Sequence, residues 1–106
     1  MTTDRELLEA AAKAAGLNYE HDLGVLSHED FNEFVCWNPL TDDGDALRLA
    51  VKLRIEVEPW IHGDSACARA AVREVLIDEP HYGEDPERAT RRAVVRAAAE
   101  IGRGMA

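Results

Sequence analysis

The sequence predicts an α+β domain in which about three helices pack on a sheet of about four strands. Three segments repeat apolar residues with the period of a helix that buries one face. Between them lie runs in which polar and apolar residues alternate, as in half-exposed strands. Helices with a single apolar stripe need a common surface, and a sheet of alternating strands supplies it. With 106 residues, the chain is expected to form a single domain over 1–106.

The first expected element is a helix from about Thr3 to Ala15. Thr3 and Glu6 have the spacing of a capping box. Gly16 suits the position just past a helix end. The predicted apolar stripe consists of Leu8, Ala11, Ala12 and Ala15.

Two strands are expected next. They cover 17–25, with a turn at 22–24, and 32–37, with a loop at 27–30 between them. Pro39 has a fixed φ and holds the residue before it extended, so the second strand has to end before Pro39.

A second helix is predicted from about Asp43 to Leu53. Asp42 and Asp43 can accept hydrogen bonds from its first N–H groups, and acids suit the positive end of a helix dipole. The predicted apolar face consists of Ala46, Leu49, Ala50 and Leu53.

The segment 54–61 alternates charged and apolar residues and is predicted to be a half-exposed strand. Pro59 in this segment suits the edge of a sheet, and a turn is expected at 62–65. Residues 66–77 are ambiguous, because alanine favours a helix whereas the run 72–77 has the character of a strand. We predict a strand over most of this region and keep a helix as the alternative.

A loop over 78–84 leads to the final helix, which is the clearest element. Asp85 is expected to cap it, Pro86 suits its first position, and Gly102 is expected to end it. The predicted buried stripe consists of Val94, Ala97, Ala98 and Ile101.

The run from Trp37 to Leu53, WNPLTDDGDALRLAVKL, is similar to one that recurs in small proteins of tailed phages and prophages. These proteins are described as the phage ABA (alpha-beta-alpha) sandwich domain, and the segments 3–8 and 89–103 fit the same picture. The resemblance implies an αβα sandwich, strands before the last helix, and a phage setting. It implies no reaction and no catalytic residues.

The composition is typical of a globular domain in water, with 46% hydrophobic and 31% charged residues. No apolar run approaches the roughly 18 residues that a membrane span needs. The first residues lack the basic and apolar regions of a signal peptide. We therefore expect a cytoplasmic location in a host bacterial cell and no membrane contact. Cys36 and Cys67 are expected to be reduced and buried.

The net charge of −9 is distributed unevenly. Residues 18–45 hold eight acids and no Lys or Arg, whereas 86–106 hold five arginines and two glutamates. The acidic balance argues against direct nucleic-acid binding, which needs a basic surface. It permits a basic protein partner or a bound cation, and it also serves solubility. The opposite charges of the two regions suggest a homodimer in which one faces the other.

Each group of candidate catalytic or metal-binding residues has a simpler structural explanation. The acidic run 42–45 contains ligands that suit Mg²⁺ or Ca²⁺, but helix capping explains it. The histidines lie close to acids without metal-binding spacing, so we predict surface positions for all of them, namely His21, His28, His62 and His81. There is no nucleophile or phosphate-loop motif. We therefore predict no catalytic residue, metal or cofactor.

The candidate binding residues are a basic line on the last helix, Arg88, Arg92 and Arg96, and the aromatics Trp60 and Tyr82. Guanidinium groups pair with phosphates and carboxylates, although a solvated face with local ion pairs is the simpler interpretation. Exposed aromatic side chains anchor protein partners.

These residues lead to three hypotheses about function. The first is a non-enzymatic phage accessory protein that binds a host component in host takeover or counter-defence, for instance as an inhibitor of an anti-phage system. The alternative is a protein that binds or sequesters a small anionic ligand such as a nucleotide signal. The third is a metal-assisted hydrolase.

Overall fold

A computed structural model describes residues 2–28 and 33–105. Within them the chain forms three α-helices, six strands and two short 3₁₀ turns, and so has the predicted α+β class. The order is α1 (Asp4–Ala15), β1 (Tyr19–Glu20), η1 (His21–Leu23), β2 (Val25–His28), β3 (Glu33–Cys36), α2 (Asp43–Leu53), β4 (Glu56–Ile61), β5 (Ser65–Ala70), η2 (Val72–Glu74), β6 (Val75–Pro80) and α3 (Pro86–Arg103).

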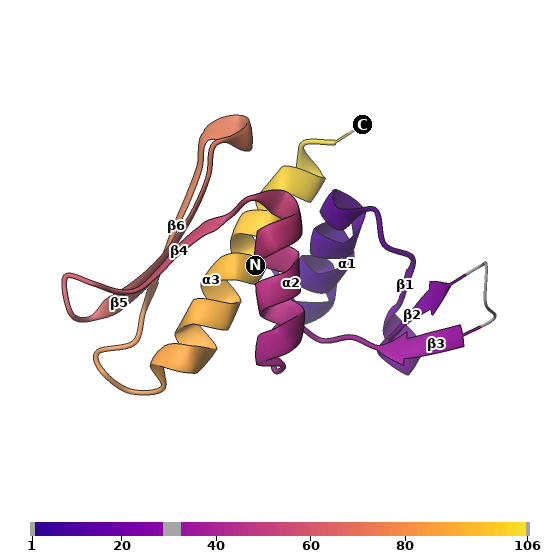
Figure 1. The fold of residues 1–106 in the computed structure, drawn as a ribbon, viewed down its shortest axis with the longest axis horizontal. Helices are drawn as coiled ribbons and strands as arrows, with labels where there is room; N and C mark the ends of the chain where they lie inside the picture. Colours follow the sequence, from indigo (N-terminus) through magenta and orange to yellow (C-terminus); the bar gives the residue numbers. More distant parts are fainter. Residues whose placement is uncertain (1, 29–32, 106) are drawn as a thin grey trace.

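Helix α3 lies at the centre of the molecule. Figure 1 shows it between the β4–β6 sheet on one side and helices α1 and α2 on the other. Its predicted stripe is buried as expected, but residues outside that stripe are buried too, including Ala89, Ala93, Val95 and Ala99. A helix in contact on several sides needs small side chains, which explains its alanine content.

The strands form two separate antiparallel sheets of three strands, in the orders β1-β2-β3 and β4-β5-β6. The prediction of one sheet of about four strands was therefore wrong. The helices lie between the two sheets (Figure 1), which also differs from the expected αβα sandwich. The inner face of β4–β6 packs on α3 through small or half-buried residues, namely Val57, Ala66, Ala68, Ala70, Val75 and Ile77.

The outer face of this sheet carries mainly polar side chains. Glu58 and Asp78 flank Cys67 in the register, and Arg69 forms ion pairs with Glu56 and Glu58. An antiparallel sheet can leave one face in water when that face is polar. In the described part of the chain, this face therefore needs no helix to cover it.

The predicted strand over most of 66–77 is confirmed, and the helix alternative was wrong. The segment contains two strands joined by η2, where Arg73 and Glu74 have positive φ. Alternate alanines of β5 point to α3, so their spacing along the chain suits a strand as well as a helix. Two predicted loops were partly wrong, because 78–80 belongs to β6 and 27–28 to β2. The predictions for 29–32 lie outside the described residues.

The smaller sheet closes the other end of the helix layer. Leu26 and Trp37 are buried in the same core as Ala15 and Leu49. Trp37 meets the ring of Tyr19 edge to face, with 5.2 Å between ring centroids. The strand before Pro39 ends at Cys36, as expected, and Trp37 beside it anchors the smaller sheet to the core.

The predicted helix starts are confirmed by their caps. The side chains of Thr3, Asp42 and Asp85 accept hydrogen bonds from backbone N–H groups in the first turns of α1, α2 and α3. The predicted end of the last helix at Gly102 was wrong, because α3 continues to Arg103. None of the helices in the described ranges is long and apolar enough to cross a bilayer.

Gly102 has a packing role instead. A Cβ atom at Gly102 would lie 1.9 Å from the carbonyl oxygen of Ala10 in α1. The missing side chain therefore allows the α1 and α3 backbones to approach each other closely at this crossing.

Replacing Gly102 by alanine tests this contact. Alanine normally stabilises a helix interior by about 1 kcal/mol relative to glycine. We expect Gly102→Ala instead to lower the free energy of unfolding by about 1–3 kcal/mol, because backbone atoms have to move. In the control Gly104→Ala, the new Cβ would meet the flexible Arg73 side chain, so little change is expected. Urea unfolding measures both, and a stabilised Gly102→Ala variant would contradict the proposed contact.

The core stripes give a second stability prediction. Leu49 and Ile101 are both buried, so changing either to alanine should lower the free energy of unfolding by about 2–5 kcal/mol. Leu47 on the same helix as Leu49 is 66% exposed. Leu47→Ala should therefore change stability by less than about 0.5 kcal/mol. Chemical denaturation measures the free energy of unfolding of each variant. Equal decreases for Leu47→Ala and Leu49→Ala would contradict the packing of the Leu49 side of α2 on the core.

Candidate functional site

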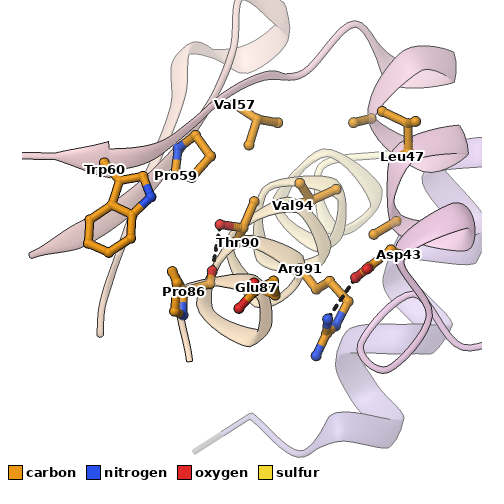
Figure 2. A pocket seen from close by; sticks show the side chains of 12 residues that line it. Asp43, Leu47, Val57, Pro59, Trp60, Pro86, Glu87, Thr90, Arg91 and Val94 are labelled. Carbon is orange, nitrogen blue, oxygen red and sulfur yellow. Dashed lines mark hydrogen bonds and ion pairs between the residues drawn. The ribbon is translucent and has the colours of Figure 1, made fainter. Parts of the chain in front are cut away.

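An apolar groove lies between α2, β4 and α3 and encloses about 340 Å³. Figure 2 shows α2 and β4 as its two walls and α3 as its floor. Each element contributes apolar side chains, including Leu47 and Ala50 from α2, Val57 and Trp60 from β4, and Pro86 and Val94 from α3. We refer to this feature as the α2–β4 groove.

Large apolar side chains at the α2–β4 groove are exposed to solvent. Leu47 is 66% exposed and Trp60 is 55% exposed. Val51, one helical turn after Leu47, is 71% exposed. Leu47 and Val51 lie outside the stripe by which α2 packs on the core, so the fold does not require them to be apolar.

Trp60 is held in place by a buried histidine. The Trp60 and His81 rings meet edge to face with centroids 4.7 Å apart. His81 is only 5% exposed, so its predicted surface position was wrong. Its Nε2 lies 2.9 Å from the Pro59 carbonyl oxygen, and the Gly83 N–H donates to Nδ1 at 2.9 Å. A neutral ring with its proton on Nε2 satisfies both contacts, so His81 has a structural role at the end of β4.

The other candidate aromatic and the remaining histidines lie elsewhere. Tyr82 is exposed but does not line the α2–β4 groove. His62 is exposed in the turn between β4 and β5, as predicted. His21 is half-buried and lies 3.0 Å from the Tyr19 hydroxyl, which corrects its predicted surface position. The prediction for the His28 side chain lies outside the described part of the chain.

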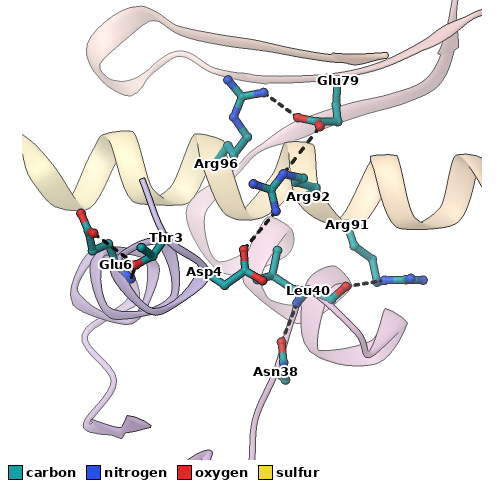
Figure 3. A network of polar contacts seen from close by, with 9 residues as sticks. All are labelled: Thr3, Asp4, Glu6, Asn38, Leu40, Glu79, Arg91, Arg92 and Arg96. Carbon is teal, nitrogen blue, oxygen red and sulfur yellow. Dashed lines mark hydrogen bonds and ion pairs between the residues drawn. The ribbon is translucent and has the colours of Figure 1, made fainter. Parts of the chain in front are cut away.

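Two arginines of the predicted basic line are half-buried in an ion-pair network rather than solvated. Arg92 lies between Asp4 of α1, at 3.2 Å, and Glu79 of β6, at 3.6 Å (Figure 3). Arg96 binds the other carboxylate oxygen of Glu79. Arg88 is exposed, as predicted. The network ties α1, α3 and β6 together, and an external anion would have to compete with Asp4 and Glu79 for these arginines.

Arg91 was not recognised from the sequence. Its Nη1 lies 2.7 Å from Asp43, and its Nε donates to the Leu40 carbonyl oxygen at 2.9 Å. Its side chain is largely buried, and it lines the α2–β4 groove. It therefore fixes the start of α2 against α3. Arg91 does not have the four-residue spacing of the predicted basic line. Its partners lie about fifty residues earlier in the chain, so no local pattern in the sequence indicates them.

The acidic run 42–45 is accounted for by local contacts, which confirms the capping interpretation. Asp42 accepts from the Asp45 N–H at 2.8 Å. Asp45 is buried and accepts from the Asn38 N–H at 3.0 Å and from Arg48 at 2.7 Å. These bonds fix the turn that launches α2.

No protein family, curated protein or solved structure compared with the chain matches it. The resemblance to the phage sandwich domain therefore stays a prediction, and the α2–β4 groove has to be interpreted from its own geometry.

The charged side chains lining the groove, among the residues that the structure describes, are Asp43, Glu87 and Arg91. Arg91 is already engaged by Asp43 and Leu40. Glu87 is exposed in the first turn of α3 and forms no ion pair within the described ranges. The rim of the groove is therefore apolar with an acidic end, where α2 and α3 begin.

The two cysteines differ in environment. Cys36 is exposed, which corrects its predicted burial, whereas Cys67 is buried as expected. Burial raises the pKa of the Cys67 thiol, and a hydrogen bond and charge from Asp78 raise the pKa further. A raised pKa leaves less thiolate at any given pH, and thiolate is the reactive form.

Alkylation of the folded protein should therefore modify Cys36 and spare Cys67. A short pulse of iodoacetamide near pH 8, followed by peptide mass spectrometry, measures both sites. In urea the two cysteines should react at similar rates, which is the control. Equal labelling in the folded protein would contradict the buried position of Cys67.

Proposed function

We propose that the chain is a non-enzymatic accessory protein that binds a partner protein through the α2–β4 groove. In the phage setting that the sequence resemblance implies, the partner is a host component, and binding serves host takeover or counter-defence. The observation that carries the proposal is the exposure of Leu47 and Trp60 at one groove, with the exposed Val51 one helical turn beyond Leu47 on α2. Exposed apolar surface gathered at one place marks interaction sites, and tryptophan is enriched among residues that dominate binding.

The contacts of four titratable side chains support a binding role. His81 and Asp45 are both hydrogen-bonded to backbone groups, which gives each of them a structural role. In the described part of the chain, Glu79 is shared by two arginines, and Asp43 is bound by Arg91. These carboxylates therefore act as structural partners of arginines.

A second candidate function is binding of a small anionic ligand such as a nucleotide. A polar groove between α1, α3 and β6 is lined by Arg92, Arg96 and Arg103, which favours this function. Glu79 and Glu100 line the same groove and pair with these arginines. An anionic ligand would have to compete with these two carboxylates for the arginines, so we place anion binding second to protein binding.

The predicted homodimer relied on arginines that pair within their own chain. Arg92 and Arg96 are engaged by Asp4 and Glu79. A dimer therefore remains a prediction for light scattering to test, and reversing these two arginines would also break contacts inside one subunit.

Protein binding is tested by capture from a bacterial host lysate with groove variants. Leu47→Asp and Trp60→Ala should each abolish capture of the partner, because they place charge in the groove or remove its aromatic wall. Leu23→Asp is the matched control, since Leu23 is 68% exposed and lies in η1 beside the smaller sheet. Unchanged thermal melting shows that each variant is folded. Capture that survives both groove substitutions would overturn the proposed function.

A further inference from the structure

We propose that the α2–β4 groove takes the apolar face of an amphipathic helix that also carries basic residues, supplied by the partner protein. This inference rests on the proposed function and specifies the class of segment that the groove recognises.

Strand β4 is poorly suited to accept a strand from a partner. It is an edge strand, because the order of its sheet is β4-β5-β6. Strand addition uses a regular row of backbone donors and acceptors along such an edge. Pro59 has no N–H to contribute, and the register of β4 is irregular between Glu58 and Ile61. The backbone of β4 therefore favours contacts through side chains over an added strand.

The length of the groove matches two turns of a helix. Its lining residues on α2 run from Asp43 to Ala50, and those on α3 run from Pro86 to Val94. At 1.5 Å per residue, each of these stretches is about 10–12 Å long. A ligand helix laid along them covers the same distance with apolar residues at i, i+3 or i+4, and i+7. A volume of about 340 Å³ accommodates those side chains while the helix backbone stays outside.

The charges at the groove select a basic ligand. Arg91 is occupied by Asp43 and the Leu40 carbonyl, so the charge that remains available in the described lining is that of Glu87. The exposed residues Glu84 and Asp85 precede α3 at the same end. A Lys or Arg beside the apolar anchors of the ligand can pair with this acidic end, which also fixes the direction of the ligand helix.

The class of ligand is tested by selection from a random-peptide display library. The peptides are long enough for about four helical turns. They are selected on the wild-type protein and counter-selected on the Leu47→Asp variant. We expect enriched peptides with apolar residues three and four positions apart and with Lys or Arg, and we expect them to bind the Leu23→Asp control. A synthetic copy of an enriched peptide should gain helical circular dichroism on binding.

Several outcomes would overturn the inference. They are enrichment of peptides with alternating apolar residues, enrichment of acidic peptides, and absence of any groove-dependent peptide. Each is distinct from failure of the proposed function, which is judged by whether lysate capture depends on Leu47 and Trp60. Groove-dependent capture without a helical peptide would retain the function and reject the helix.

The basic character of the ligand has its own test. Glu87→Gln should weaken binding of an enriched peptide roughly three- to five-fold at low salt, because one exposed ion pair is lost. Glu20→Gln is the matched control, since Glu20 is exposed on β1 in the other sheet. Equal affinities of the two variants in fluorescence anisotropy would overturn the assignment of a basic ligand.

Discussion

The structure depends on the close contact of α3 with the elements around it. Ala93, Ala97, Ala98 and Ala99 are fully buried on this helix, and Gly102 lets the α1 backbone pass at short distance. Small side chains bring backbones together, and the many close atomic contacts that result replace the large side chains of a usual core. The β4–β6 sheet and the other two helices are arranged around this one element, whereas the smaller sheet lies beyond α1, away from α3 (Figure 1).

Features decided by neighbouring residues could be predicted from the sequence. The caps at Thr3, Asp42 and Asp85 are local hydrogen bonds, so residue type and spacing were sufficient to find them. The number and order of the sheets could not be found in this way. Which strands pair depends on contacts between distant segments, and the alanines of β5 have no strong preference for a strand.

The candidate site was only partly visible in the sequence. Trp60 was identified because exposed aromatics often bind partners, and the structure places it at the α2–β4 groove. Leu47 was not identified as a site residue, although the predicted apolar face of its helix leaves it outside. Its place at a groove follows from how α2 and β4 sit on α3, which no local pattern contains. The pairing of Arg92 and Arg96 with Glu79 was not predicted, because Glu79 was assigned to a loop, whereas it lies on the inner face of β6.

The position of α3 along the chain has a consequence for synthesis in the cell. Every other helix buries its apolar stripe against an element that is translated after it, since α3 follows all other helices and strands of the described chain. Until α3 leaves the ribosome, α1, α2 and the β4–β6 sheet lack the surface that they cover in the native state. The nascent chain therefore keeps these apolar segments exposed until α3 has been translated, and native structure should form in one cooperative step once α3 has left the ribosome.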